Sequence, residues 1–310
     1  MKMYVGVTDG NWFNSLKERN ATEVNFWKPS ATNFRALSKN DLFLFKLHSP
    51  NNFVVGGGFF VHFSILPSFL AWQAFGENNG AKSLDELNKR LKIYRSKNRI
   101  NDENFDIGCI ILTDVFYFER NDWIPIPSDW SSNIVSGKSY TLDTQTGKAL
   151  FRQVEDRRQA QYSINKEVGQ ASSVHENNRY YKTMTKHRIG QGAFRILVTD
   201  AYKRRCAITG EKTLPVLEAA HVKPFSREGP NDIRNGILLK SDFHTLFDDG
   251  YITVDKDHKI NVSKKLYNDY GNGKYYYKFH GERLIFLPDT LQEHPSEEFL
   301  TWHNENVYVG

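Results

Sequence analysis

The sequence predicts a two-domain α+β protein, in which a β-rich domain precedes a domain of short strands and helices. The first observation is the length of 310 residues, which exceeds one ordinary core and suits two domains. The second is a change of pattern, because the polar stretch 151–187 has no apolar period of its own. We therefore expect domains over 1–150 and 188–310, joined by a partly helical linker over 151–187.

Five runs of β-branched and aromatic residues predict the strands of the first domain. These runs cover residues 3–7, 23–27, 41–47, 52–63 and 107–118. Three glycines at 56–58 fall inside the fourth run and predict a bulge or sharp bend of the kind that barrels use. Ser83 and Glu86 form a capping box that predicts the start of a helix. The first domain is thus expected to be a small bent β-barrel with added helices.

The second domain is predicted to begin with a helix around "GAFRILVTDAYKRR", where apolar residues recur at helical spacing. The stretch "CAITGEKTLPVLEAAHV" predicts a β-hairpin around a Thr-Gly turn. A second helix is expected within "NGILLKSDFHTLFDDG", with Ser241 as its N-cap and Gly250 just beyond its end.

The composition and charge of the sequence limit the classes of protein to which it can belong. Hydrophobic content of 39% and charged content of 25% are typical of a globular protein. No run of 18 uncharged apolar residues and no apolar leader occur, so we expect a cytoplasmic protein without a membrane span. Lys and Arg number twelve against five Asp and Glu between Lys182 and Lys240, a local net charge of +7 that suits phosphate contacts.

His221 ends the apolar run "EAAHVKP" and is followed by Asn235 in "NGILL" and by His244 in "FHTLFDDG". With "RIGQGAF" and "CAITG", the order and spacing of these segments resemble the HNH nuclease family, over about Arg188 to Val262. The resemblance implies a ββα-metal fold and an endonuclease that hydrolyses phosphodiester bonds. A histidine with a pKa near 6.5 is a suitable general base at neutral pH.

The family pattern implies a role for each residue of this set. His221 stands at the general-base position, and Asn235 at the position that fixes the loop and orients the histidine. His244 and Asp248 are four residues apart, so they share one helical face and could hold one divalent ion, Mg²⁺ or Mn²⁺. Ala220 departs from the pattern, since that position is usually a metal ligand. Glu218 is the expected substitute, directly or through water.

Two further expectations concern the same domain. Cys206 has Thr209 where the partner of a CxxC pair would stand, so we expect no structural zinc. Four cations near the motif are predicted to contact the DNA backbone: Lys223, Arg227, Arg204 and Arg205.

The stretch "EVNFWKPSATNFRALSKNDLFLFKLHSPNNFVVGGGFF" is similar to the PUA superfamily, which includes EVE and SRA domains. The resemblance implies a bent barrel that binds nucleic acid and holds a flipped modified base. Flipping costs a few kcal/mol, and stacking on aromatic rings returns about 1–3 kcal/mol per base. The predicted pocket consists of two preferred rings and three groups that could read base edges: Trp27, Trp12, Asn25, Ser30 and Asp9.

Together these features resemble a modification-dependent (type IV) restriction endonuclease. We expect an enzyme that recognises modified cytosine, 5-hydroxymethylcytosine or 5-methylcytosine, in double-stranded DNA and cuts nearby. One HNH site cuts one strand, so double-strand cleavage suggests a homodimer. Two alternatives stay open: an HNH endonuclease without modification dependence, and a non-catalytic nucleic-acid reader with a degenerate HNH fold.

Overall fold

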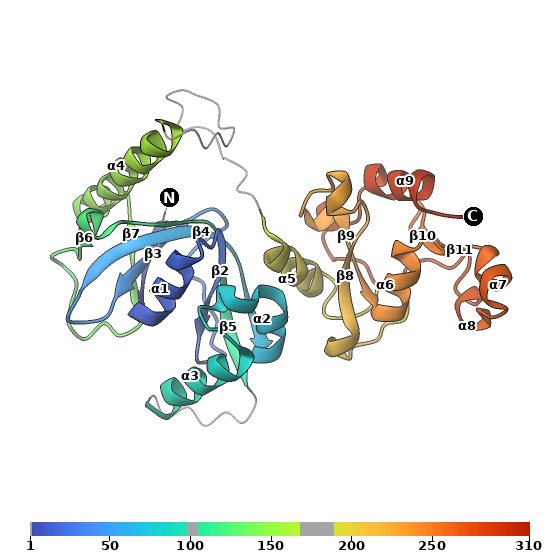
Figure 1. Ribbon diagram of the computed structural model, residues 1–310, viewed down its shortest axis with the longest axis horizontal. Coiled ribbons are helices and arrows are strands. Elements are labelled where there is room, and N and C mark those ends of the chain that lie inside the picture. The colour runs from blue at the N-terminus through green and yellow to red at the C-terminus, as the bar shows by residue number, and fades with distance from the viewer. Residues whose placement is uncertain (1, 98–104, 168–188) are drawn as a thin grey trace. The chain divides into compact units, whose positions relative to one another are not determined.

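A mixed β-sheet frames the N-terminal part of the chain in this computed structural model, which describes residues 2–97, 105–167 and 189–310 (Figure 1). The strand order is β2-β5-β4-β3-β1-β7, and β6 pairs with β4. β1 and β3 are parallel, and the other neighbours are antiparallel. The strands are β1 Lys2–Thr8, β2 Glu23–Lys28, β3 Leu42–Leu47, β4 Phe53–Pro67, β5 Asp106–Tyr117, β6 Ile124–Pro125 and β7 Gly137–Thr141.

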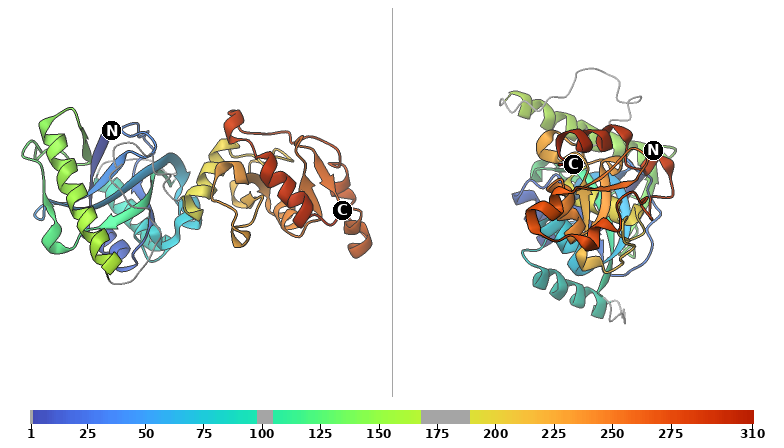
Figure 2. Two further views of the ribbon diagram at one scale, coloured as in Figure 1. Left: turned by 90° about the horizontal axis from the view of Figure 1, so that it is seen from above. Right: turned by 90° about the vertical axis from the view of Figure 1, so that its right-hand side faces the viewer.

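Helices cover the sheet because its side chains alternate between two apolar faces. Leu42 and Leu44 of β3 belong to the core that includes Leu150 and Val154 of α4, the long helix beside the sheet in Figure 2. Phe45 points to the opposite face, where the ring of Trp12 on α1 meets it. The helices of this part are α1 Gly10–Glu18, α2 Ser68–Phe75, α3 Leu84–Lys97 and α4 Gln145–Glu167.

The five predicted strands are confirmed as β1 to β5, and so is the bulge at the glycines. The register between β4 and β5 shifts between Gly57 and Phe59. A Cβ at Gly56 or Gly57 would collide with the backbone oxygens of neighbouring strands, so only glycine fits there. The expected closed barrel is not found, because within the described residues the strand path ends at β2 and β7 without joining them.

The helix predicted after Ser83 is also confirmed. The hydroxyl of Ser83 accepts a hydrogen bond from the backbone N–H of Glu86 at 3.1 Å. The carboxylate of Glu86 accepts instead from the N–H of Lys82 at 2.9 Å, one residue before the predicted cap. No helix in the described ranges is long and apolar enough to cross a membrane.

The chain separates into two compact units, Met1–Arg188 and Ile189–Gly310. Residues 151–167 of the predicted linker continue α4, where Arg157 donates to the carbonyl of Asp122 at 2.6 Å. Residues 168–187 lie outside the described residues. The linker boundaries drawn from the sequence therefore remain a proposal.

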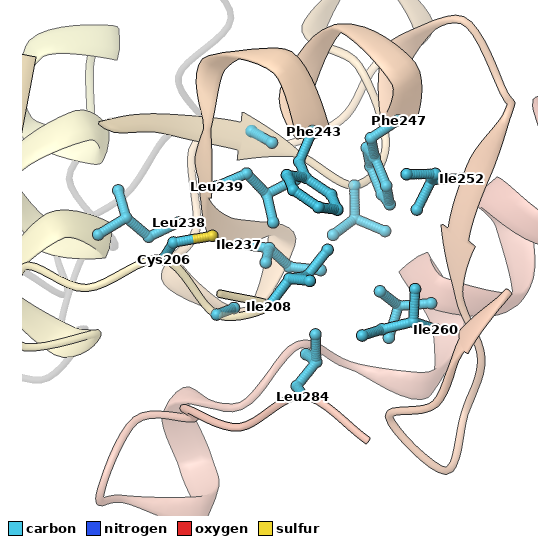
Figure 3. Packing of buried hydrophobic residues seen from close by; sticks show 14 of the residues in the cluster. Cys206, Ile208, Ile237, Leu238, Leu239, Phe243, Phe247, Ile252, Ile260 and Leu284 are labelled. Atoms are coloured by element: carbon cyan, nitrogen blue, oxygen red, sulfur yellow. The ribbon is translucent and has the colours of Figure 1, made fainter. Parts of the chain in front are cut away.

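The second unit is built around a small antiparallel pair of strands and the helix that follows it. β8 Leu217–His221 pairs with β9 Gly236–Lys240, and α6 Ser241–Asp248 begins directly after β9. The other elements are α5 Gln191–Ala201, β10 Ile252–Val254, β11 Ile260–Val262, α7 Lys265–Tyr270, α8 Lys274–Tyr277 and α9 Glu297–Asn306. Figure 3 shows the core of this unit, in which Phe243 and Phe247 of α6 pack on aliphatic side chains of β9, β10 and β11.

The hairpin predicted within this unit was wrong in its first strand. Residues 206–210 form a turn and not a strand, with Gly210 at a positive φ of 75°. Ala207 donates one backbone hydrogen bond to Leu238 at 2.7 Å. The strand that actually pairs with β8 comes later in the chain, because the loop 222–235 returns β9 alongside it. Ser241 likewise is the first helical residue of α6, and Lys240 occupies the N-cap.

Candidate active site

His221 is the last residue of β8 and lies opposite Gly236, the first residue of β9. The missing side chain at Gly236 lets α5 approach, because a Cβ there would collide with Val198 and press on Phe194. The ring of Phe194 stacks on the imidazole of His221, with 3.9 Å between ring centroids and 13° between planes. The local fold therefore fixes the plane of the histidine ring.

Asn231 fixes which nitrogen of His221 carries the proton. Its Nδ2 donates to the carbonyl oxygen of Ile189 at 3.0 Å, so its Oδ1 must be the atom that faces the ring. Oδ1 lies 2.9 Å from Nε2 of His221. An amide oxygen only accepts hydrogen bonds, so Nε2 carries the hydrogen and donates it. The lone pair of the neutral ring then lies on Nδ1, which is the atom left to accept a proton.

The electrostatic setting keeps this ring neutral near pH 7. Burial lowers the pKa of His221 below its usual 6.5, against the hydrogen bond with Asn231 and the charge of Asp248, both of which raise it. The positive form of nearby His244 lowers it further. A histidine with a lowered pKa is in its basic form over the neutral range, as a general base requires.

Asn235 is completely buried and closes the loop that carries Asn231. Its Oδ1 accepts the backbone N–H of Lys223 at 2.8 Å, and its Nδ2 donates to the carbonyls of Lys223 and Pro230, both at 2.9 Å. Both ends of the loop 222–235 are thus held by one amide. Asn235 acts on the backbone around His221, and Asn231 is the side chain that hydrogen-bonds to the ring.

His244 lies between two carboxylates. Its Nδ1 is 2.6 Å from Oε2 of Glu218, and its Nε2 is 3.2 Å from Oδ2 of Asp248. A neutral imidazole has only one N–H, so it can donate to only one of these carboxylates. A second proton or a bound cation is needed to satisfy the other contact. Partial burial raises the pKa of Asp248, while the charge of His244 opposes this rise.

This arrangement fits one divalent cation. With Nδ1–H donated to Glu218, the lone pair on Nε2 and the oxygen of Asp248 converge as ligands on one face of α6. Glu218 would then orient His244 without itself contacting the ion. Among the described residues no three His, Cys, Asp or Glu side chains form a ready-made metal shell. Two protein ligands suit an ion such as Mg²⁺, which keeps several waters and takes substrate phosphate.

Two side chains near this site were missed by the sequence interpretation. Asn231 lies in a loop, and its proximity to His221 depends on how the chain returns from β8 to β9. Arg195 lies on α5, next to Phe194 in the chain. Burial lowers the pKa of Arg195 and the charge of Glu218 opposes this, which places a guanidinium near the carboxylate of Glu218. Its helical position in "GAFRIL" gives no sign of this in the sequence.

The four predicted backbone cations have different surroundings. The ammonium group of Lys223 lies 5.6 Å from the ring of Trp302, and Arg227 ends a short 3-10 turn after Pro224 and is exposed. Arg204 pairs with Asp200 at 3.3 Å, and the guanidinium of Arg205 lies 5.0 Å from the ring of Phe286. DNA contact by these four residues stays a prediction.

The predicted base-reading residues lie together in the first unit, mostly inside its core. Trp12 is 2% exposed. Its ring packs edge-on against those of Phe26 and Phe45, with 5.2 and 5.1 Å between ring centroids. Trp27 is 9% exposed, and its indole N–H donates to the carbonyl of Asn79 at 2.9 Å. Both rings pack against protein in this conformation. Their role in base stacking stays a prediction.

The polar members of the predicted pocket are linked to the same core. Asn25 donates to Oδ1 of Asn79 at 2.9 Å, while its own Oδ1 is buried without a partner in the described structure. Asp9 caps α1 by accepting the N–H of Trp12 at 2.8 Å. The hydroxyl of Ser30 lies 3.0 Å from that of Thr32 and is exposed.

Comparisons with known proteins agree with this geometry in the second unit. Residues 206–255 match a family model described as HNH endonuclease. No curated protein matches the chain. A solved structure titled modification-dependent TagI restriction endonuclease aligns with 93% of this chain and 76% of its own, at 12% identity and a TM-score of 0.28. A likeness this low carries no argument about this chain.

The family match includes β8, β9 and α6. These elements and their connecting loop carry the half-buried His221, the buried Asn235, and His244 beside Asp248. The prediction of an HNH endonuclease domain is therefore confirmed for residues 206–255, and its predicted bounds of 188–310 stay a prediction. Residues 206–255 are an HNH endonuclease domain, and the protein is a nuclease.

Proposed function

We propose that this protein is a DNA endonuclease that recognises modified cytosine with its first unit and hydrolyses phosphodiester bonds at His221. The observation that carries the catalytic part is the hydrogen-bonded chain from Ile189 through Asn231 to Nε2 of His221. It leaves Nδ1 as the only basic atom of a ring whose plane is fixed by Phe194.

In the proposed reaction, Nδ1 of His221 takes a proton from a water molecule as that water attacks the phosphorus. The bond between phosphorus and the 3′ oxygen breaks, and the departing oxygen takes a proton from a solvent water, so the products carry a 5′-phosphate and a 3′-hydroxyl. The hydrogen bond from Nε2–H to Asn231 persists when the ring becomes positive, and it stabilises that form. The charge of Asp248 acts in the same direction.

His244 and Asp248 are the residues that would hold the divalent ion, with Glu218 orienting His244. When bound, such an ion neutralises charge on the phosphate and on the departing oxygen. Mg²⁺ or Mn²⁺ suits the imidazole and carboxylate donors, neither of which is a soft thiolate.

Recognition of modified cytosine rests on the resemblance of the first unit to PUA-superfamily domains. Its parallel β1–β3 pair, its bulged β4 and its aromatic core are compatible with a base reader built on a bent, open sheet. Base flipping into a pocket of this unit is the proposed mode of recognition. Because one HNH site cuts one strand, we also propose that double-strand cleavage requires a homodimer.

A second candidate is an HNH endonuclease without modification dependence. The burial of Trp12 and the hydrogen bond from Trp27 to Asn79 favour it, because neither indole presents an open stacking face. In this case the first unit would bind unmodified DNA.

Digestion of matched DNA separates the two candidates. Substrates of one sequence carrying cytosine, 5-methylcytosine, 5-hydroxymethylcytosine or glucosylated 5-hydroxymethylcytosine are incubated with the full chain and Mg²⁺ or Mn²⁺. The proposal predicts cutting of at least one modified substrate and much less cutting of plain DNA. Equal cutting of all four would remove modification dependence and leave the second candidate.

A further inference from the structure

The hairpin of α7 and α8 carries a group of exposed tyrosines and lysines outside the HNH domain. Tyr267, Tyr270 and Tyr275 are 55%, 64% and 47% exposed, which is unusual for large rings in a folded unit. Four lysines in the same segment are exposed as well. We call these seven residues the tyrosine–lysine surface: Lys264, Lys265, Tyr267, Tyr270, Lys274, Tyr275 and Lys278.

The hairpin itself is firmly anchored, so its exposed rings are not the result of a frayed terminus. Leu266 is buried in the core, and the hydroxyl of Tyr277 donates to the carbonyl of Ser263 at 2.9 Å. Gly271 and Gly273 have φ values of 62° and 117°, which only glycine adopts readily, and they make the tight turn between the helices. The fold therefore displays the tyrosine–lysine surface on a fixed support.

The surface is strongly positive. Between 264 and 278 the chain has four lysines and one acid, Asp269, for a net charge of +3. The carboxylate of Asp269 accepts a hydrogen bond from the hydroxyl of Tyr251 at 2.9 Å. Within the described residues none of the four lysines has a carboxylate at ion-pair distance. Their charges are therefore available to an anionic partner.

The tyrosine–lysine surface contacts the start of α6, the helix that carries His244 and Asp248. The ring of Tyr275 has the ammonium group of Lys278 at 4.1 Å and that of Lys240 at 5.7 Å from its centroid. Tyr276 donates to a carboxylate oxygen of Asp242 at 3.3 Å and packs edge-on against Phe243. α8 thus rests on the first turn of α6.

The distance to the cation ligands is short. Lys240 precedes His244 by four residues, which is about 6 Å along a helix axis at 1.5 Å per residue. Each strand of B-DNA has a phosphate every 3.4 Å of helix axis, and the backbone winds around that axis, so about 6 Å corresponds to roughly one nucleotide along the strand. A backbone held at the active site would therefore bring neighbouring phosphates towards Lys240 and Tyr275.

We propose that the tyrosine–lysine surface binds the phosphate backbone of DNA next to the bond that is cut. The lysines supply positive charge for the phosphates, and the tyrosine hydroxyls can donate hydrogen bonds to phosphate oxygens. The ring of Tyr275 holds the ammonium groups of Lys278 and Lys240 near its face by cation–π interactions. This inference rests on the proposed function, since it takes DNA as the substrate. It adds a binding surface that lies beyond residues 206–255.

The test measures DNA binding as a function of salt. The full chain with His221→Ala binds a fluorescent duplex without cutting it, and log K is plotted against log[salt]. Lys274→Gln/Lys278→Gln is compared in this background with a control that removes the same charge, Lys256→Gln/Lys259→Gln. The control lysines are exposed in the β10–β11 turn, where Asp255 and Asp257 offset their charge. Each double variant is also made with His221 intact, and its cleavage of a small p-nitrophenyl thymidine phosphodiester measures whether the chemical step is preserved.

Each phosphate contact contributes about 0.9 to the salt slope, which is a factor of about 5 to 8 in affinity at 0.1–0.15 M salt. We expect Lys274→Gln/Lys278→Gln to lower the slope by about 2 and the affinity by about 30- to 60-fold, with small-diester cleavage and the control unchanged. An unchanged slope, or an equal loss in the control, would overturn the inference while leaving the nuclease proposal intact. If the parent protein binds no DNA at any salt, the proposed function fails and this inference fails with it.

Discussion

Removal of the Asn231 side chain tests whether this residue sets the protonation of His221. In Asn231→Ala the partly buried Nε2–H loses its acceptor at 2.9 Å, and the ring can also turn or exchange its proton to Nδ1. Leaving such a donor unpaired costs about 1–2 kcal/mol, which corresponds to about 5- to 30-fold in kcat. This is less than the 10²- to 10⁴-fold expected from loss of the base itself.

The assay is strand cleavage at saturating DNA, combined with the ¹⁵N chemical shifts of His221, which distinguish the two neutral forms of the ring. Asn231→Asp keeps an acceptor but adds a negative charge. At about 4 Å this charge contributes about 1–4 kcal/mol, so the pKa of His221 should rise by about 1 to 3 units. The acidic limb of the kcat profile should move to higher pH by the same amount. A wild-type kcat in Asn231→Ala, with unchanged ¹⁵N shifts, would refute this assignment.

Three further predictions follow from the same site. Burial lowers the pKa of His221 below its usual 6.5, so the midpoint of the acidic limb of wild-type cleavage should lie below pH 6.5, and a midpoint above pH 7 would contradict this. Glu218→Gln should weaken Mn²⁺ binding by about 10- to 100-fold in calorimetric titrations, and Asp248→Asn should weaken it more; the reverse order would make Glu218 the direct ligand. Asn235→Ala removes three hydrogen bonds of a buried amide and should lower the free energy of unfolding by about 3 kcal/mol in thermal melting. The control Asn268→Ala, at an exposed residue, should change the free energy of unfolding by less than about 0.5 kcal/mol. Equal losses in the two variants would contradict the role of Asn235 in holding the loop 222–235.

The sequence predicts those strands, turns and helical pairs that depend on residues close together in the chain. The strands of the first unit follow from runs of β-branched and aromatic residues, and the bulge follows from three glycines in a row, where a Cβ at Gly56 or Gly57 would collide with neighbouring strands. The helical spacing of His244 and Asp248 places both on one face, and the structure has them 3.2 Å apart. These features depend on neighbours within a few residues.

Features that depend on how distant segments return to one another could not be predicted. The strand that pairs with β8 comes from 236–240, and the Thr-Gly turn gives no information about it. The contact from Asn231 to His221 depends on the path of the loop that Asn235 closes. The position of Glu218 against Nδ1 of His244 likewise arises from the packing of α6 on β8.

The most direct test of the account is the rate of DNA strand cleavage by the full chain and by His221→Ala, each with Mn²⁺ and at equal occupancy by DNA. The account predicts metal-dependent cutting by the wild-type protein and a rate lower by 10²- to 10⁴-fold in His221→Ala, with DNA affinity unchanged. Cutting by His221→Ala at the wild-type rate would show that a different group activates the water.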